Sequence, residues 1–228
     1  MTPIPLAEEL LLLAYDDQTG KATGSRIGLD LGMAAAVLID LALANRIAYA
    51  ADGYLKVVDA TPLGDPVADA VLEKVSADEP HTPAQWLQRL RHRLRTRVLE
   101  DLCARGVVQD VDETQLGVIH VHRYPTTDHA FEAEIRGRLA EALTSGALCD
   151  ERTAALATLL VACRMEPNLR LPAEVVARAH ERLEQIASGA GFMAGANLED
   201  SIVRPSVALV VATLGKAIQA ALGAPKPA

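Results

Sequence analysis

The sequence predicts a mainly α-helical fold, a single globular helical domain over residues 1–228 with a core of apolar helices and one or two β-hairpins. Half of the residues are hydrophobic but only 3% are aromatic, so the core must consist largely of Leu, Val, Ile and Ala. Ala and Leu have the strongest helix propensities. Apolar residues also recur at intervals of three and four, the period of an amphipathic helix. A chain of 228 residues can bury a substantial core.

Helical patterns occupy most of the chain. They cover residues 5–16, 29–46, 67–75, 86–106, 129–144, 150–165, 172–188 and 201–222. The first helix is apolar on most sides, so we expect it to be buried, and Glu8 and Glu9 are interpreted as helix-start charges. The last helix leaves almost no polar face over residues 206–222, which predicts a buried helix at the centre of the bundle.

Two β-hairpins interrupt these helices. The stretch IAYADGYLKVVDAT places two β-rich runs around Asp52-Gly53, a dipeptide typical of tight hairpin turns. The stretch VVQDVDETQLGVIHVHRYP predicts a second hairpin over residues 107–124, with a longer acidic loop. Since an exposed strand edge invites pairing, we expect this hairpin to support self-association. The apolar residues expected at that contact are Leu116, Val118, Ile119 and Val121.

The most distinctive segment is WLQRLRHRLRTRVLEDLCARG, residues 86–106. Five arginines and His92 fall within nine residues without an acid, in a chain whose formal net charge is −8. The arginines are Arg89, Arg91, Arg93, Arg95 and Arg97. Leucines at helical spacing would dock one face on the core, and guanidinium groups on the remaining surface can bind phosphate oxygens in pairs. The alternative is a solvated helix face whose arginines pair with acids of a neighbouring element.

Other chemistry is less well supported. Three widely spaced cysteines, Cys103, Cys149 and Cys163, fit neither a disulfide framework nor a zinc site and indicate a reducing compartment. The N-terminal residues lack the basic region of a signal peptide, and no apolar run is long enough to span a bilayer. We therefore expect a cytoplasmic protein, and we expect it to hold no cofactor.

Histidines near the second hairpin suggest a metal site only weakly. His120 and His122 share one face of a predicted strand, and Asp128 and His129 follow. A zinc site would need further ligands at good geometry, so polar alternation on the solvent-facing side of the hairpin explains them better. No nucleophile elbow or recognisable pair of catalytic acids is present, and we expect no enzyme.

Several stretches, in order, resemble the Golgi phosphoprotein 3 family. They are PLAEELLLLAYDDQTG, AVLIDLALANRI, GDPVADAVLEKV, RTRVLEDLCARGVV, RYPTTD, IRGRLAEAL and DERTAALATLLVAC. The resemblance covers residues 4–165 and continues in the order of the later elements, and the Ala- and Arg-rich composition is that of a bacterial-type member. It implies a mainly α-helical domain with a variable start over residues 1–25 and a projecting second hairpin, through which family members oligomerise.

The resemblance also implies a non-enzymatic peripheral membrane adaptor that recognises phosphatidylinositol 4-phosphate at a basic pocket. The pocket's tryptophan and first arginine fall on Ser25 and Ala34, and its two helix residues fall on His92 and Arg95. Arg26 lies beside the replaced tryptophan. With two of four groups replaced, we expect binding to anionic lipid headgroups in general rather than to that lipid selectively. The expected headgroup-binding residues are Arg95, His92, Arg26, Arg91 and Arg97.

The expected partners follow from this interpretation. They are an anionic phospholipid surface on the inner face of the membrane, the tails of membrane proteins, and further copies of the chain. We expect Arg95 to matter most, with His92 one helical turn away adding charge in mildly acidic conditions. The alternatives are a winged-helix-like regulator that binds nucleic acid or protein, and an enzyme with a scattered site. The net charge of −8 and the acidic second hairpin argue against nucleic acid.

Overall fold

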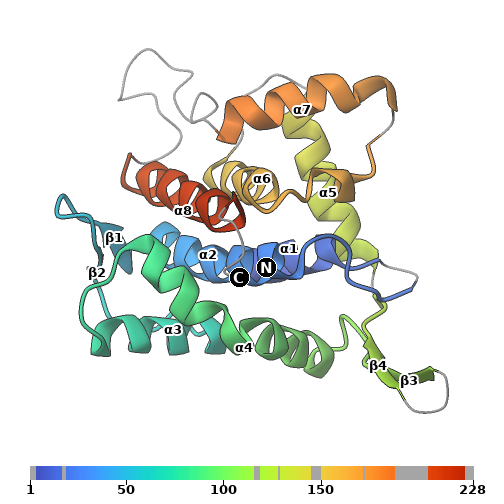
Figure 1. Ribbon diagram of the computed structural model, residues 1–228, viewed down its shortest axis with the longest axis horizontal. Helices are drawn as coiled ribbons and strands as arrows, with labels where there is room; N and C mark the ends of the chain where they lie inside the picture. Colours follow the sequence, from blue (N-terminus) through green and yellow to red (C-terminus); the bar gives the residue numbers. More distant parts are fainter. Residues whose placement is uncertain are drawn as a thin grey trace.

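The computed structural model describes residues 4–16, 19–115, 119–127, 129–144, 150–171, 173–187 and 205–223. These residues form a mainly α-helical fold, as the sequence predicts (Figure 1). The helices are α1 (Leu6–Ala14), α2 (Arg26–Leu43), α3 (Pro66–Ala77), α4 (Pro83–Ala104), α5 (His129–Thr144), α6 (Glu151–Cys163), α7 (Ala173–Ala187) and α8 (Pro205–Gly223), with a 3₁₀ helix at Glu166–Leu169. The strands are β1 (Ile47–Tyr49), β2 (Leu55–Val57), β3 (Val111–Gln115) and β4 (Ile119–Arg123).

Helix α2 is the centre of the fold. In Figure 1, α3 and α4 lie below α1 and α2, whereas α6 and α8 lie above them and α7 covers the top. Helix α2 contacts α1, α3, α4, α6 and α8. Its small residues permit this close packing, because a Cβ added at Gly32 would lie 2.5 Å from the Sγ of Cys163 on α6. One core cluster of buried residues draws on all eight of these helices.

The prediction that the last helix occupies the centre is wrong. Helix α8 buries one face, which includes Val210, Leu214 and Ile218, against α2 and α6. Its opposite face is partly open, and the side chain of Leu209 is 47% exposed. The apolar composition of α8 therefore exceeds what its buried face requires. Within the described ranges, no helix combines the length and the apolar character needed to cross a membrane.

Both predicted hairpins are present. Strands β1 and β2 pair in antiparallel register from Ile47 with Val57 to Tyr49 with Leu55, and the turn between them contains Gly53 at a φ of +88°. Strands β3 and β4 form the second hairpin, which projects from the helices in Figure 1. The proposed contact residues Leu116 and Val118 lie outside the described residues, as do the side chains of Ile119 and Val121. Self-association through this hairpin therefore stays a prediction.

The two glutamates at the start of α1 are buried, which the sequence did not indicate. Glu8 and Glu9 are 4% and 1% exposed. Glu9 forms ion pairs with Arg138 on α5 and with Arg152 on α6, and Glu8 forms one with Arg105 on α4. These carboxylates are more than helix-start charges, because they join α1 to three other helices.

Candidate functional site

The arginine-rich helix α4 begins at a well-defined cap. Thr82 and Gln85 form a capping box, in which each side chain accepts a hydrogen bond from the backbone N–H of the other, and Pro83 occupies the first turn. The helix therefore starts three residues before the predicted residue 86. Trp86 and Leu94 lie on the buried face, 0% and 4% exposed, as the apolar spacing predicts.

The helical geometry of α4 is interrupted in the middle of the arginine run. His92 has an extended backbone, with φ −76° and ψ 129°, and Arg93 has a positive φ of 71°. A positive φ is unfavourable for any residue with a Cβ atom. Consequently His92 and Arg95 are not separated by a regular helical turn. The expectation that both contact one phosphate relied on that turn, so the backbone geometry does not support it.

The arginines of α4 divide into paired and unpaired groups. Arg89 forms an ion pair with Asp78 at 3.2 Å, and Arg95 Nε lies 3.5 Å from Asp30 Oδ1 on α2. In contrast, no ion pair or side-chain hydrogen bond within the described part of the chain involves Arg91, His92, Arg93 or Arg97. The solvated-face interpretation is thus correct for two arginines, whereas the unpaired ones leave an uncompensated basic surface.

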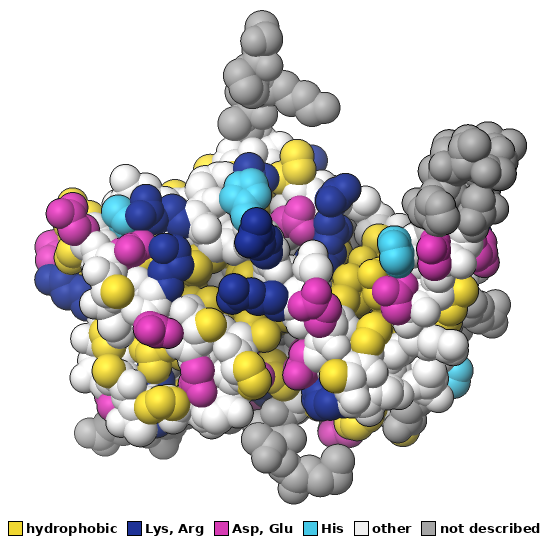
Figure 2. Space-filling view, turned by 90° about the horizontal axis from the view of Figure 1, so that it is seen from below, with side chains coloured by type: hydrophobic (Ala, Val, Ile, Leu, Met, Phe, Trp, Pro, Cys, Tyr) yellow, Lys and Arg dark blue, Asp and Glu magenta, His cyan; other side chains and the backbone are white. Residues whose placement is uncertain are grey.

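This basic surface is open to solvent. Arg93 and Arg97 are exposed, as is His92, while Arg91 is half-buried and its Nε atom is buried without a hydrogen-bond partner. Figure 2 shows basic side chains gathered in the upper half of the face seen from below, with histidines among them. We call Arg26 and the four unpaired residues of α4, Arg91, His92, Arg93 and Arg97, the basic face.

Arg26 and Arg95 both act electrostatically on one tyrosine, Tyr15. Burial raises the pKa of the Tyr15 hydroxyl, and the positive charges of Arg95 and Arg26 act against that shift. Both guanidinium groups are therefore within electrostatic range of Tyr15, as is Asp30, whose negative charge raises the same pKa. Arg26 and Arg95 were among the residues predicted from the sequence. Tyr15 and Asp30 were not predicted, because their approach to the two arginines depends on the packing of α1, α2 and α4.

Neither replaced position of the implied lipid pocket is available for headgroup binding. The Ser25 side chain caps α2, since its Oγ accepts a hydrogen bond from the Gly28 N–H at 3.1 Å. Ala34 is 0% exposed and lies in the core. The Ala34 side chain therefore cannot contact a ligand at the surface. Of the four pocket positions, His92 and Arg95 remain as candidate ligands.

The loop after α1 connects this region to the projecting hairpin. The Tyr124 N–H donates a hydrogen bond to the Gly20 carbonyl at 2.9 Å, and the rings of Tyr15 and Tyr124 pack edge to face at 5.9 Å. A Cβ at Gly20, whose φ is +61°, would lie 2.5 Å from the Tyr124 nitrogen. The base of the hairpin is therefore held beside Tyr15.

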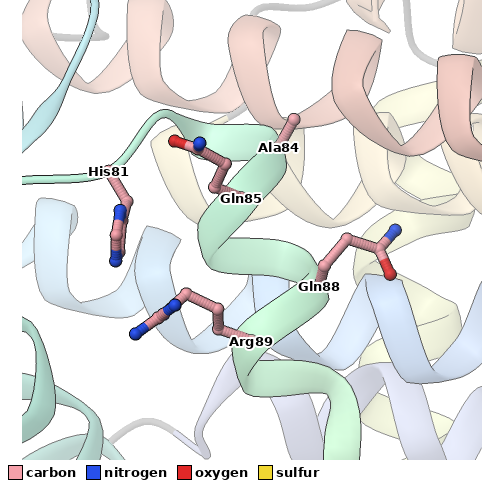
Figure 3. Close-up of a pocket in the computed structure, with 5 residues that line it drawn as sticks. All are labelled: His81, Ala84, Gln85, Gln88 and Arg89. Atoms are coloured by element: carbon pink, nitrogen blue, oxygen red, sulfur yellow. The ribbon is translucent and has the colours of Figure 1, made fainter.

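A groove of about 380 Å³ crosses the first turns of α4 (Figure 3). His81, Gln85 and Arg89 extend to one side of the helix in this view, whereas Gln88 points to the other. Each of the three is already engaged: the His81 ring packs against Trp86 at 5.0 Å, Gln85 completes the cap, and Arg89 pairs with Asp78. The groove offers no free charge and is a weaker candidate site than the basic face.

A scan against protein-family models matches residues 6–215 to Golgi phosphoprotein 3 (GPP34). The chain belongs to the Golgi phosphoprotein 3 family. The match runs from the start of α1 into α8, so it includes the basic face and both hairpins. The resemblance in the sequence is thereby confirmed. No curated protein matches the sequence significantly.

In this member of the Golgi phosphoprotein 3 family, His122 of the second hairpin contacts an acid. His122 Nδ1 lies 2.9 Å from Asp110 Oδ1, and this carboxylate raises the pKa of the imidazole. Among the residues that the structure describes, no group of three or more His, Cys, Asp or Glu side chains is arranged to hold a metal ion. The side chains of His120 and Asp128 lie outside the described residues.

Proposed function

We propose that this protein binds membrane surfaces peripherally by recognising anionic phospholipid headgroups at the basic face. The observation that carries the proposal is the group of unpaired cations on α4, Arg91, His92, Arg93 and Arg97, in a chain with a net charge of −8. Such a chain as a whole is repelled by anionic lipids. Attraction must therefore come from a local concentration of basic side chains.

Two further features support contact with a bilayer. Basic residues near an anionic membrane each contribute on the order of 1 kcal/mol, so four arginines supply enough attraction for reversible binding. Ile27, next to Arg26 in the first turn of α2, is 48% exposed. An apolar side chain beside cations can enter the interfacial region while the cations contact phosphates.

The basic face supports general anionic recognition better than selection of one phosphoinositide. Selective recognition needs several fixed hydrogen bonds to the phosphate groups. Ser25 is occupied as a helix cap, Ala34 is buried, and Arg95 is already paired with Asp30. We therefore propose a cytoplasmic, non-enzymatic adaptor-type protein that uses surface charge, with tails of membrane proteins and further copies of the chain as its protein partners.

Vesicle flotation tests the proposal. At low salt, the protein should float with vesicles that contain about 30% phosphatidylserine and remain in solution with pure phosphatidylcholine vesicles. Binding should decrease steeply at 0.5 M salt, because screening removes surface attraction. Replacing phosphatidylserine by phosphatidylinositol 4-phosphate at equal total charge should change binding little. Absence of flotation with every anionic vesicle at low salt would contradict the proposal.

Nucleic acid is a poorer ligand for this fold. The second hairpin carries Asp110, Asp112 and Glu113, which would repel phosphates if the hairpin acted as a wing. Glu113 pairs with Arg123 across the strands, so that arginine is compensated. We do not propose a regulator that binds nucleic acid.

A further inference from the structure

A cavity of about 800 Å³ lies where residues before α1 meet α2, α3 and the last turns of α4, and none of the residues of the basic face lines it. This volume lies within the range of small-molecule sites. Helices α1, α5 and α6 each contribute a side chain, namely Glu8, Phe131 and Arg152. Part of the wall is apolar and is formed by Ile4, Pro5, Leu43, Leu63, Pro66 and Phe131.

The charged part of the wall has an excess of acid. Its carboxylates are Glu8, Asp40, Asp65 and Asp101, and its guanidinium groups are Arg105 and Arg152. Arg105 is shared, since it lies 2.5 Å from Glu8 and 2.8 Å from Asp101. Arg152 is likewise shared between Asp40 and Glu9, at 2.9 Å from each. Four carboxylates against two guanidinium groups leave two negative charges on the wall.

Glu8 is a deeply buried carboxylate whose one ion-pair partner, Arg105, is shared with Asp101. Its side chain is 5% exposed, and its Oε2 pairs with Arg105 but accepts no hydrogen bond of good geometry. Burial raises the pKa of Glu8, against the opposing effect of Arg105. Burial also raises the pKa of Asp40 to about 6, although Arg152 and the Leu6 N–H act in the other direction. Added positive charge in the cavity would lower the free energy of both carboxylates in their ionised forms.

The arrangement favours an extended cation over a compact one. Glu8 and Asp101 share Arg105, whereas Asp40 pairs with Arg152, so the acids contact two different guanidinium groups. Those in the described ranges form no cluster that could hold a metal ion. An apolar wall between separated carboxylates fits an aliphatic chain with an ammonium group at each end. We propose that this cavity binds a linear aliphatic diamine or polyamine, with its ammonium groups at the carboxylates and its methylene groups along the apolar wall.

Calorimetric titration of the full chain at low salt tests the ligand class. Spermidine and 1,5-diaminopentane should each bind with a stoichiometry of one, and pentylamine should bind about tenfold more weakly than the diamine because it offers a single charge. Magnesium chloride at the same concentration should give no saturable signal. The proposal fails if spermidine gives no binding up to 10 mM, or if pentylamine or magnesium binds as tightly as the diamine.

Two matched variants test the site. Asp65 and Asp150 both cap helices, α3 and α6, and Asn is an equally good cap, so each Asp→Asn change removes one charge while keeping the helix start. Only Asp65 lines the cavity. Asp65→Asn should weaken spermidine binding about fivefold or more, whereas Asp150→Asn should change it less than twofold. Equal losses of spermidine affinity in the two variants would show that the net negative charge of the protein attracts spermidine without a defined site, and would overturn the proposal.

The pH dependence gives a second readout. Asp40 faces Arg152 on α6 and the Leu6 N–H and Glu9 on α1, and it takes up a proton near pH 6. Glu8 has a raised pKa as well. Diamine binding should therefore weaken as the pH falls from 8 to 5, and the protein should release protons when the diamine binds at pH 6. Binding that is independent of pH over this range would contradict the assigned location.

Discussion

Arg95 Nε lies 3.5 Å from Asp30 Oδ1, and the two side chains are only 17% and 20% exposed. The arginine that best matches the lipid pocket implied by the resemblance is thus partly buried and already compensated by an acid from α2. A phosphate group that approaches Arg95 must compete with Asp30. The unpaired arginines of α4 face no such competitor in the described part of the chain.

Removal of Asp30 should strengthen membrane binding. Asp30→Asn frees the charge of Arg95, and one more uncompensated basic residue near the surface should raise affinity for anionic vesicles about fivefold. Vesicle co-sedimentation at low salt measures this change. Asp78→Asn is the control, because it removes the same single charge and frees Arg89 on the earlier turns of α4 and Lys74 on α3. An equal gain in both variants would show that affinity follows net charge alone.

Glycine at position 93 should stabilise the fold. Arg93 has a φ of 71°, which costs an L residue roughly 1 kcal/mol and glycine almost nothing. Arg93→Gly should therefore raise the free energy of unfolding by about 1 kcal/mol in urea denaturation. Arg97→Gly loses the same charge from a regular helical position and should lower stability by about 1 kcal/mol. If both variants lose stability equally, α4 is a continuous helix in solution.

Much of the fold followed from patterns that are local in the sequence. Helix α5 has the predicted bounds. Helices α3 and α4 start one and three residues before their predicted positions, although Asp65-Pro66 and Thr82-Pro83 are recognisable cap signals. The interruption at residues 92–93 had no such signal, because the apolar spacing of Leu90, Leu94 and Val98 continues across it. The exposure of Leu209 depends on how α8 packs against α2 and α6, which no local pattern records.

The two faces of α8 should respond differently to truncation. Leu214 is 0% exposed, so Leu214→Ala should lower the free energy of unfolding by about 2 to 5 kcal/mol. Leu209 is 47% exposed, so Leu209→Ala should lower it by less than about 1 kcal/mol. Urea denaturation monitored by circular dichroism measures both. A loss well under 1 kcal/mol for Leu214→Ala would place α8 outside the core.

Asp40 should make stability depend on pH. Folding raises its pKa from 3.8 to about 6, so the folded chain binds more protons than the unfolded chain between these values. This contribution is complete below about pH 4 and is lost as the pH rises through 6. The stability of the natural protein relative to Asp40→Asn should therefore fall by on the order of 3 kcal/mol between pH 4 and 7.

An exposed acid provides the control for that measurement. Asp52 is exposed, and a hydrogen bond from Lys56 lowers its pKa, so its smaller contribution is present at neutral pH and is lost as the pH falls. The free energy of unfolding of the natural protein, taken relative to that of Asp52→Asn, should therefore fall as the pH is lowered, which is opposite to the trend for Asp40. A stability difference between the natural protein and Asp40→Asn that does not change from pH 4 to 7 would refute the role given to Asp40.

The candidate site was predictable in composition but not in detail. The run of arginines on one helix is visible in the sequence, whereas the choice of Arg26 came from the resemblance to the family and stays a prediction. Which arginines are compensated depends on Asp78 at the end of α3 and on Asp30 on α2, and only the fold brings these acids to α4. The acidic cavity could not be predicted from the sequence either, because its carboxylates come from α1, α2, the start of α3 and α4, which are far apart in the chain.

The most direct test of membrane recognition compares two triple variants of equal charge. Arg91→Ala/Arg93→Ala/Arg97→Ala removes three cations of the basic face, and Lys56→Ala/Lys74→Ala/Lys216→Ala removes three exposed cations elsewhere. Flotation with phosphatidylserine vesicles at low salt should fall more than tenfold for the arginine variant and by less than about threefold for the lysine variant. Equal binding by the two variants would contradict the assignment of lipid recognition to α4.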